Sequence, residues 1–196
     1  MIIYLDTETT GLYPGNICQL SYIIETKEDV KIKNFYFCVD YVEPSAQSVH
    51  GLSVEVLKEL SSSLRFSNHI DEIQKDLSSA ELIISHNTAF DLMFLRREFE
   101  NNNRVLNIKE SFCSMKKMTP VCKLLRSNKT AYKYPKLSEL CGYFGITDSE
   151  ILNATRKVFG EPCGYHDARF DTTALYLAMT KGRMTEESLS GLEKYL

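Results

Sequence analysis

The chain begins with three segments whose residue patterns are typical of β-strands, at residues 1–5, 17–25 and 30–39. The first segment is a short, uninterrupted apolar run, which is typical of a buried strand. Helical patterns follow, and one further apolar run interrupts them at residues 82–84. Strands first, and then helices alternating with at least one more strand, predict a mixed α/β fold with a central sheet. We expect helices after Ser53, along 70–77, from Asn87 or Thr88 to about 101, over 137–143 and 149–158, from about 167 to 181, and near 185.

The composition is that of one globular domain covering residues 1–196. With 43% hydrophobic and 25% charged residues, the chain can bury a full core without disulfides or a structural metal. No apolar run approaches the ~18 residues of a membrane-spanning helix. The N-terminus reaches Asp6 without a basic lead, which excludes a secretory signal. The six cysteines lack zinc-site spacing, so we expect reduced thiols in a cytoplasmic protein that does not contact membranes.

Charge is distributed unevenly along the chain. Residues 104–136 contain nine basic residues and one acid, Glu110, which gives a net charge of +8. The whole chain carries −3, so the remaining residues carry −11. This asymmetry suggests a local contact with a polyanion on an otherwise acidic body, although a solvated basic loop would show the same pattern.

Two acids, Asp6 and Glu8, follow directly after the first apolar run. Residues two apart in a strand point to the same face, so the two carboxylates lie side by side and repel each other. A hard divalent cation between them is the simplest way to relieve that repulsion. The wet face of a surface strand would also accommodate two acids, so the pair is not specific by itself.

The residues after the acids narrow the interpretation. Residues 6–12 read Asp-Thr-Glu-Thr-Thr-Gly-Leu, which places hydroxyls, a glycine and the apolar Leu12 next to the carboxylates. Backbone N–H groups in such a turn can hold a terminal hydroxyl or phosphate. Leu12 is then in a position to press against a base.

This run resembles the first motif of the DnaQ-like 3′–5′ exonucleases of the DEDDh type, the family of the proofreading exonucleases. That family's second motif is matched by His86-Asn-Thr-Ala-Phe-Asp91, and its third motif by His166 and Asp171 with four residues between them. The three motifs occur in order over nearly the whole chain. Residues 50–53, His-Gly-Leu-Ser, and residues 133–137, Lys-Tyr-Pro-Lys-Leu, are similar to two further family segments.

The resemblance implies a ribonuclease-H-like fold of class α/β. Such a fold has three layers, with a mixed central sheet of about five strands flanked by helices. The first three strands would be antiparallel, and the acidic residues would meet at the end of the first strand.

The resemblance also implies a two-metal mechanism of phosphodiester hydrolysis. Asp6, Glu8 and Asp171 would hold the first cation, Asp6 would bridge to the second, and Asp91 would support the second. Carboxylates without thiol ligands favour Mg²⁺ or Mn²⁺ over zinc. His166 would be the general base, a role that suits an imidazole at neutral pH. One family branch uses tyrosine at this point, but the spacing to Asp171 selects His166 over the adjacent Tyr165.

The implied substrate is a nucleic-acid 3′ end, and the product is a 5′-nucleoside monophosphate. Thr9 and Leu12 would hold the terminal nucleotide, with His50 and Asn87 near the end of the strand. The basic stretch would follow the backbone of a single strand, in a groove formed by Lys116, Lys117, Lys133 and Lys136 with Tyr132 and Tyr134 nearby. Of these lysines, Lys133 and Lys136 are the residues expected to bind substrate.

Three functions are compatible with these residues. The first motif favours a DNA exonuclease that acts on single-stranded or frayed ends. An exoribonuclease would use the same acids and histidine, because only contacts to the 2′-OH separate the two. A non-catalytic module that binds nucleic-acid ends would be expected to lack one of these residues, and none is missing. We expect a monomer or weak homodimer, and we see no polymerase-docking tail after Asp171.

Overall fold

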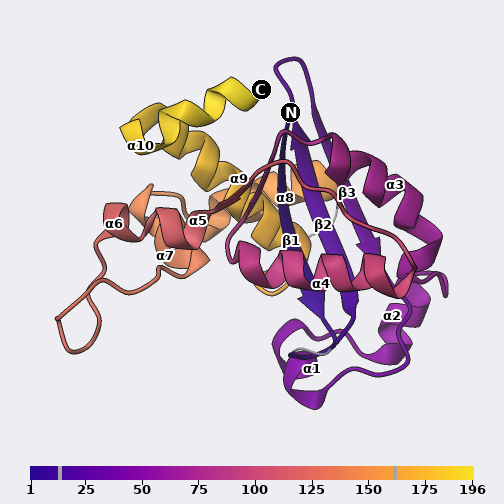
Figure 1. The fold of residues 1–196 in the computed structure, drawn as a ribbon. Helices are drawn as coiled ribbons and strands as arrows, with labels where there is room; N and C mark the ends of the chain where they lie inside the picture. The colour runs from indigo at the N-terminus through magenta and orange to yellow at the C-terminus, as the bar shows by residue number, and fades with distance from the viewer. Residues whose placement is uncertain (13–14, 161–162) are drawn as a thin grey trace.

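The computed structural model describes residues 1–12, 15–160 and 163–196. Within these residues a single sheet has the strand order β3-β2-β1-β4-β5 (Figure 1). The first three strands pair antiparallel, whereas β4 pairs parallel to β1 and β5 parallel to β4. The strands are β1 (Ile2–Thr9), β2 (Ile17–Glu25), β3 (Val30–Tyr36), β4 (Leu82–Ser85) and β5 (Ser111–Cys113). The predicted mixed sheet with an antiparallel first half is confirmed, and the fold is ribonuclease-H-like.

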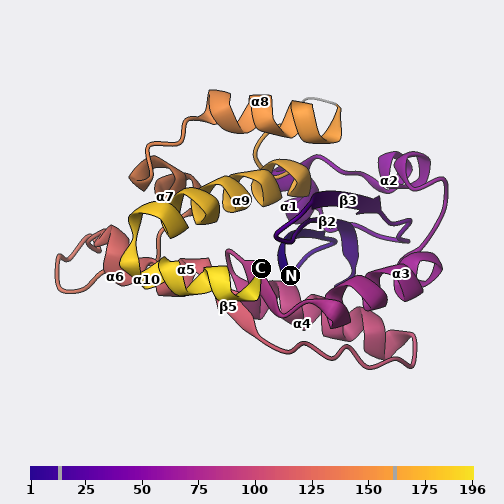
Figure 2. The ribbon, with the colours of Figure 1, turned by 90° about the horizontal axis from the view of Figure 1, so that it is seen from above.

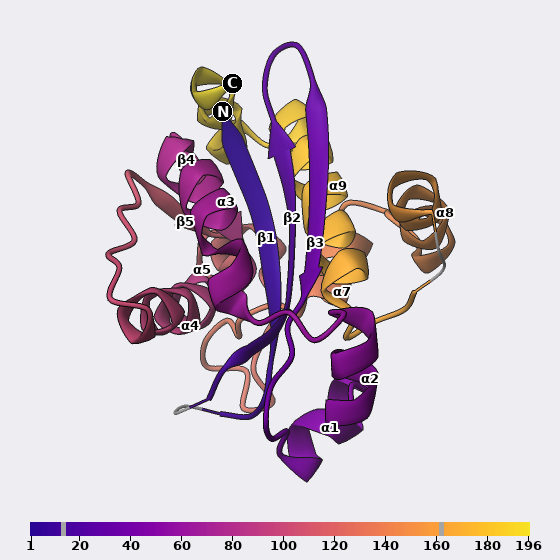
Figure 3. The same cartoon turned by 90° about the vertical axis from the view of Figure 1, so that its right-hand side faces the viewer.

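Helices cover both faces of this sheet. They are α1 (Pro44–His50), α2 (Val54–Leu60), α3 (Phe66–Ser79), α4 (Thr88–Asn101), α5 (Ser114–Lys117), α6 (Thr119–Cys122), α7 (Leu137–Tyr143), α8 (Asp148–Phe159), α9 (Ala168–Thr185) and α10 (Glu187–Ser190), followed by a 3-10 turn η1 (Gly191–Tyr195). Seen from the side, α3 and α4 lie on one face and α9 lies on the other, with α8 outside α9 (Figures 2 and 3). The three expected layers are therefore present.

Alternation along β1 sends its side chains into two separate cores. Ile2 and Tyr4 pack in the cluster that contains α7 and α9. Ile3 and Leu5 pack in the cluster that contains α3 and α4. The same alternation continues through the polar end of the strand. Asp6 and Glu8 therefore belong to the α9 side of the sheet, and Thr7 belongs to the α4 side.

Several predicted boundaries were wrong. The first strand does not stop at residue 5 but continues to Thr9, because its polar end still pairs with β2. The third strand ends at Tyr36 instead of residue 39. The first helix was expected only after Ser53, but residues 44–50 already form α1, with Pro44 in its first turn. This helix buries none of its residues, so no apolar stripe marks it in the sequence.

The basic stretch also contains structure that was not expected. Strand β5 and the short helices α5 and α6 lie within residues 111–122. None of them is longer than four residues, which is too short for a periodic pattern to develop.

Among the described residues, no helix has both the length and the apolar character that crossing a membrane requires.

Candidate active site

Three carboxylates from two distant segments meet on the α9 face of the sheet. Asp6 and Glu8 come from β1, and Asp171 comes from the first turn of α9. One carboxylate oxygen of each lies within 4.8 Å of the others. The sequence prediction that these three acids share one site agrees with this geometry.

The fourth acid, Asp91, reaches the same region from the other side of β1. It lies in the first turn of α4, is only 3% exposed, and accepts a 2.8 Å hydrogen bond from the Thr7 hydroxyl. Thr7 lies between Asp6 and Glu8 on β1. The same strand therefore carries these two acids and, through Thr7, orients Asp91. Sequence reasoning missed Thr7, because a threonine inside an acidic motif gives no sign of the helix it will contact.

Burial and mutual repulsion raise the pKa values of this cluster. The pKa of Asp6 lies well above its ordinary value because the side chain is buried and because Asp171, Asp91 and Glu8 surround it. Burial and the neighbouring acids raise the pKa of Glu8 to about 9, and burial raises that of Asp171 to about 7. The strongest charged influences on Asp6 are all acids. A bound cation would favour the ionised form of these carboxylates.

The acids open into a cleft of about 630 Å³. One wall comes from the start of α4 and another from the start of α7, and residues before α9 complete the rim. The residues that line the cleft are Asp6, Thr7, Glu8, His86, Asn87, Phe90, Asp91, Lys136, Leu137, Ser138, Tyr165, His166 and Asp171. A cleft with acids at its floor and a histidine and a lysine at its rim can admit the end of a polyanionic strand.

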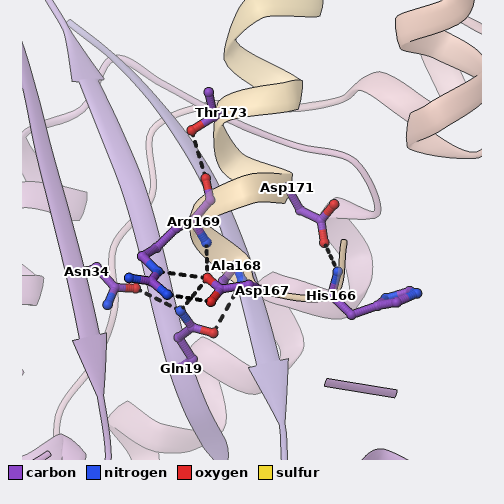
Figure 4. Close-up of polar contacts among 8 residues, drawn as sticks. All are labelled: Gln19, Asn34, His166, Asp167, Ala168, Arg169, Asp171 and Thr173. Carbon is purple, nitrogen blue, oxygen red and sulfur yellow. Dashed lines mark hydrogen bonds and ion pairs between the residues drawn. The ribbon is translucent and has the colours of Figure 1, made fainter. Parts of the chain in front are cut away.

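His166 lies on the rim in an unusual backbone conformation. Its φ is +64°, and its backbone N–H donates a 3.0 Å hydrogen bond to Asp171 Oδ2. The imidazole is exposed and extends away from α9 (Figure 4). The adjacent Tyr165 donates its hydroxyl to Asp148 at 2.6 Å. Burial and that carboxylate raise the pKa of Tyr165, so its phenol is a poor base.

The chain is similar in sequence to known exonucleases. The sequence model of the RNase_T family, described as "Exonuclease", matches residues 3–176. The chain belongs to the DnaQ-like DEDDh exonucleases. It is 30% identical to DNA polymerase III subunit epsilon of Escherichia coli (strain K12) over 194 residues, covering 92% of this chain and 72% of that protein. The Salmonella typhimurium subunit is 31% identical over the same length and coverage.

Solved structures of this exonuclease fold superpose on the chain. Exonuclease I matches 97% of the chain with a TM-score of 0.74 at 16% identity, and the chain spans 43% of that longer protein. The nuclease domain of 3′hExo, a DEDDh family member bound to rAMP, matches 96% of the chain and 93% of its own length, with a TM-score of 0.66 at 12% identity. As a member of the family, the protein is a hydrolase of the 3′–5′ exonuclease class.

In this exonuclease a buried polar group fixes the start of α9 (Figure 4). Asp167 caps the helix and accepts hydrogen bonds from Arg169 and from Gln19 Nε2, the latter at 2.9 Å. Gln19 Oε1 in turn accepts from the backbone N–H of Ala168, and Gln19 Nε2 also donates to Asn34. Gln19 is fully buried on β2. We name Gln19, Asn34, Asp167, Ala168 and Arg169 the α9 clamp.

Within the clamp, both carboxylate oxygens of Asp167 accept hydrogen bonds. Burial alone would raise the pKa of Asp167, but hydrogen bonds from Arg169 and Gln19 lower it below the ordinary value. Both oxygens of Asp167 face Arg169 at 2.7 to 3.0 Å. Asp167 therefore serves the helix terminus, while Asp171, one turn later, faces the acids. The position of Asp167 just before a helix is an N-cap signal, but nothing in the sequence indicates that Gln19 is its hydrogen-bond partner.

Thr9 and Leu12 lie at the end of the first motif, and His50 contacts the backbone of Thr9. Thr9 is buried and donates its hydroxyl to Gly11 O, while Leu12 is 75% exposed. His50 Nε2 donates to Thr9 O at 3.2 Å, and His50 Nδ1 accepts from the Leu52 N–H at 3.1 Å. Burial lowers the pKa of His50, in keeping with this neutral form. His50 thus supports the strand end with both ring nitrogens, and it does not line the cleft.

Gly11 lies close to Glu43 within the same turn. A Cβ at this position would lie 2.3 to 2.7 Å from the carboxylate of Glu43, so a larger residue would require that flexible side chain to move. Glu43 also donates its backbone N–H to Thr10 O at 2.7 Å. This hydrogen bond joins the loop before α1 to the turn.

The remaining residues expected to bind substrate separate into two groups. Asn87 and Lys136 line the cleft, and both are exposed. Lys133 does not line it, because its ammonium group forms an ion pair with Glu139. Glu139 also accepts a 2.8 Å hydrogen bond from the backbone N–H of Lys136. The ion pair of Lys133 with Glu139 therefore stabilises the start of α7.

His86, the first residue of the second motif, has a structural role that sequence reasoning did not assign. Its Nε2 lies 2.9 Å from Pro135 O, and its Nδ1 lies 3.0 Å from Ser114 Oγ. The carbonyl can only accept, so Nε2 carries the proton. Burial lowers the pKa of His86, which keeps the ring neutral. His86 thus fastens the segment before Lys136 to the wall of the cleft.

Proposed function

We propose that this protein removes 5′-nucleoside monophosphates from the 3′ end of DNA, acting on single-stranded or frayed ends. The observation that carries the proposal is the cluster of Asp6, Glu8 and Asp171, whose oxygens lie within 4.8 Å of one another beneath a cleft rimmed by His166. The curated relatives are subunits of a DNA polymerase, which favours DNA over RNA. Both apolar cores pack on one sheet, so we also propose that residues 1–196 act as one exonuclease domain.

The donor set fits hard divalent cations. The family uses divalent metal ions, and we propose Mg²⁺ or Mn²⁺ because every available ligand is a carboxylate. Asp6, Glu8 and Asp171 would hold one cation, with Asp6 shared with a second that Asp91 supports. Bound cations would supply a nucleophilic water at neutral pH and relieve charge on the leaving alkoxide.

The protein's own residues would perform the remaining steps. His166 would take a proton from the attacking water, since its exposed ring is free to turn toward a bound strand end. The backbone at Thr9 and the exposed Leu12 would hold the terminal nucleotide, with Asn87 and Lys136 contacting the strand at the cleft. His50 and Lys133 would act indirectly, by holding Thr9 and the start of α7.

The test uses a 5′-labelled single-stranded DNA oligomer and its RNA twin, each with Mg²⁺, with Mn²⁺ and with chelator. We expect a ladder that shortens from the 3′ end of the DNA, that is absent with chelator and absent for Asp6→Asn. A ladder on RNA alone would keep the mechanism and assign the protein to RNA. Binding of both strands without any ladder would contradict the catalytic proposal and leave a module that binds ends.

A further inference from the structure

A hairpin arm projects from the molecule between α6 and α7. Within residues 124–133, the N–H of Arg126 donates to Ala131 O at 2.9 Å, and the N–H of Lys133 donates to Leu124 O at 2.7 Å. Leu125 and Tyr132 form the antiparallel bridge between the two limbs. Both views show these residues reaching well beyond the neighbouring helices (Figures 1 and 2). We call residues 124–133 the basic arm.

Much of the positive charge of the arm and its flanks has no ion-pair partner among the described residues. Residues 111–138 contain seven basic residues and no acid, and one of the seven, Lys133, is paired with Glu139. Lys123, Arg126 and Lys129 are exposed and form no ion pair within the described residues. A polyanion is a suitable partner for these three charges.

Apolar side chains are exposed on the same arm. Leu125 is 52% exposed and Tyr132 43% exposed, and the bridge places them directly opposite each other. Tyr134, at the root of the arm, is 55% exposed. Aromatic rings beside unpaired cations form the usual surface for single-stranded nucleic acid, on which bases stack while cations follow the phosphates. A duplex offers no free base faces, so this combination favours a single strand.

The root of the arm is fastened to the active-site cleft. His86, which lines the cleft, holds Pro135 O at 2.9 Å, and Lys133 is paired with Glu139. Lys136, three residues beyond the arm, lines the cleft itself. Lys136 thus places one positive charge between the acids and the root of the arm.

We propose that the basic arm binds the single strand upstream of its 3′ end, so that catalytic efficiency increases with strand length. The inference rests on the proposed function, because it assigns the arm to the substrate of the same cleft. Arg126 and Lys129 contact phosphates, and Tyr132 stacks on a base. Residues at the acids act on the terminal nucleotide alone, so a dinucleotide is too short to reach the arm.

The experiment compares Arg126→Ala/Lys129→Ala with wild type on a dinucleotide and on a long oligonucleotide. A second variant, Tyr132→Ser, removes the ring without changing charge. The control, Lys27→Ala/Lys157→Ala, removes two exposed lysines elsewhere; Lys27 lies in the β2–β3 turn, at the opposite end of the sheet from Glu8. All these positions are exposed, and thermal unfolding checks that each variant folds.

We expect kcat/KM on the long strand to fall about tenfold in the double variant, as for the loss of two phosphate contacts, while the control stays unchanged. On the dinucleotide we expect a change of less than twofold. The salt slope of oligonucleotide binding, measured by anisotropy in chelator, should flatten by about 1.4 for two lost cations on a single strand. Equal losses on both substrates, or an unchanged salt slope, would overturn the proposal.

The binding measurement separates this inference from the proposed function. A wild-type protein that cleaves neither substrate contradicts the exonuclease, yet a salt slope that flattens in Arg126→Ala/Lys129→Ala and not in the lysine control still supports the arm as a contact for single strands. Cleavage with identical length dependence in wild type and both arm variants supports the exonuclease and rejects the arm.

Discussion

His166 combines a special backbone conformation with a free side chain. Its φ of +64° lies in the left-handed region, and its N–H is bound to Asp171, so the backbone helps to place an acid while the ring stays exposed. Asparagine tolerates this conformation and cannot serve as a base. We expect His166→Asn to lower kcat by about 10²- to 10⁴-fold, the usual contribution of a general base, while metal affinity by calorimetry stays close to wild type.

Tyr165 provides the control for that variant. Its hydroxyl is engaged with Asp148 at 2.6 Å, so Tyr165→Phe should retain nearly full turnover. A crippled Tyr165→Phe beside an active His166→Asn would reverse the assignment. Loss of metal binding in His166→Asn would show instead that the residue acts through Asp171.

Between elements, the α9 clamp joins the sheet to the helix that carries the third motif. Gln19→Leu keeps the volume but leaves the Ala168 N–H and Asp167 without their partner on β2. We expect a loss of about 1–3 kcal/mol in the free energy of unfolding. We also expect kcat to fall by about tenfold or more, because small displacements of catalytic groups are costly. Urea unfolding and steady-state kinetics measure the two effects.

Tyr4→Phe is the matched control for the clamp. The Tyr4 hydroxyl donates to Glu25 at 2.6 Å, and Glu25 pairs with Arg183 at the far end of α9. This change should cost about 1 kcal/mol of stability and leave kcat unchanged. If both variants lower kcat in proportion to stability, the clamp has a structural role only.

The sequence predicted well those elements whose apolar residues form the face that packs against the core. Ile70, Ile73 and Leu77 form the buried stripe of α3, and residues 82–84 form most of β4. The missed helix α1 has Pro44 at its start and Gly51 with φ +75° at its end, so its capping signals were present. It was missed because capping signals without an apolar stripe also fit a loop.

For the whole molecule, the site residues were predictable and their partners were not. The acids and His166 stand in short motifs whose order can be read directly along the chain. Gln19 meets Asp167 across 148 positions, and His86 meets Pro135 across 49. The first pair depends on how α9 packs against β2, and the second on how the segments before α4 and α7 meet. No local spacing encodes that packing.

The acid cluster makes the stability of the whole fold depend on pH and on metal. The pKa values of Glu8 and Asp171 are raised to about 9 and about 7, so above about pH 4 the folded state binds more protons than the unfolded state. Their stabilising contribution is complete below that pH and is lost as pH rises through the raised values. In chelator, we expect unfolding free energy to fall by about 2 kcal/mol between pH 6.5 and pH 8, or roughly 5 °C in Tm.

The window from pH 6.5 to pH 8 lies between the ordinary pKa values of histidine and cysteine, about 6.5 and about 8.5. At pH 8, Mg²⁺ or Mn²⁺ should restore the lost Tm, since a cation that binds only the folded state stabilises it by mass action. Asp6→Asn removes one of the repelling charges and one ligand, so its Tm in chelator should depend less on pH and respond less to metal. Scanning calorimetry across this pH range measures both effects. Two results would show that these acids do not form the cation site. One is a wild-type Tm in chelator that does not depend on pH, and the other is an Asp6→Asn protein whose Tm rises as much with metal as that of wild type.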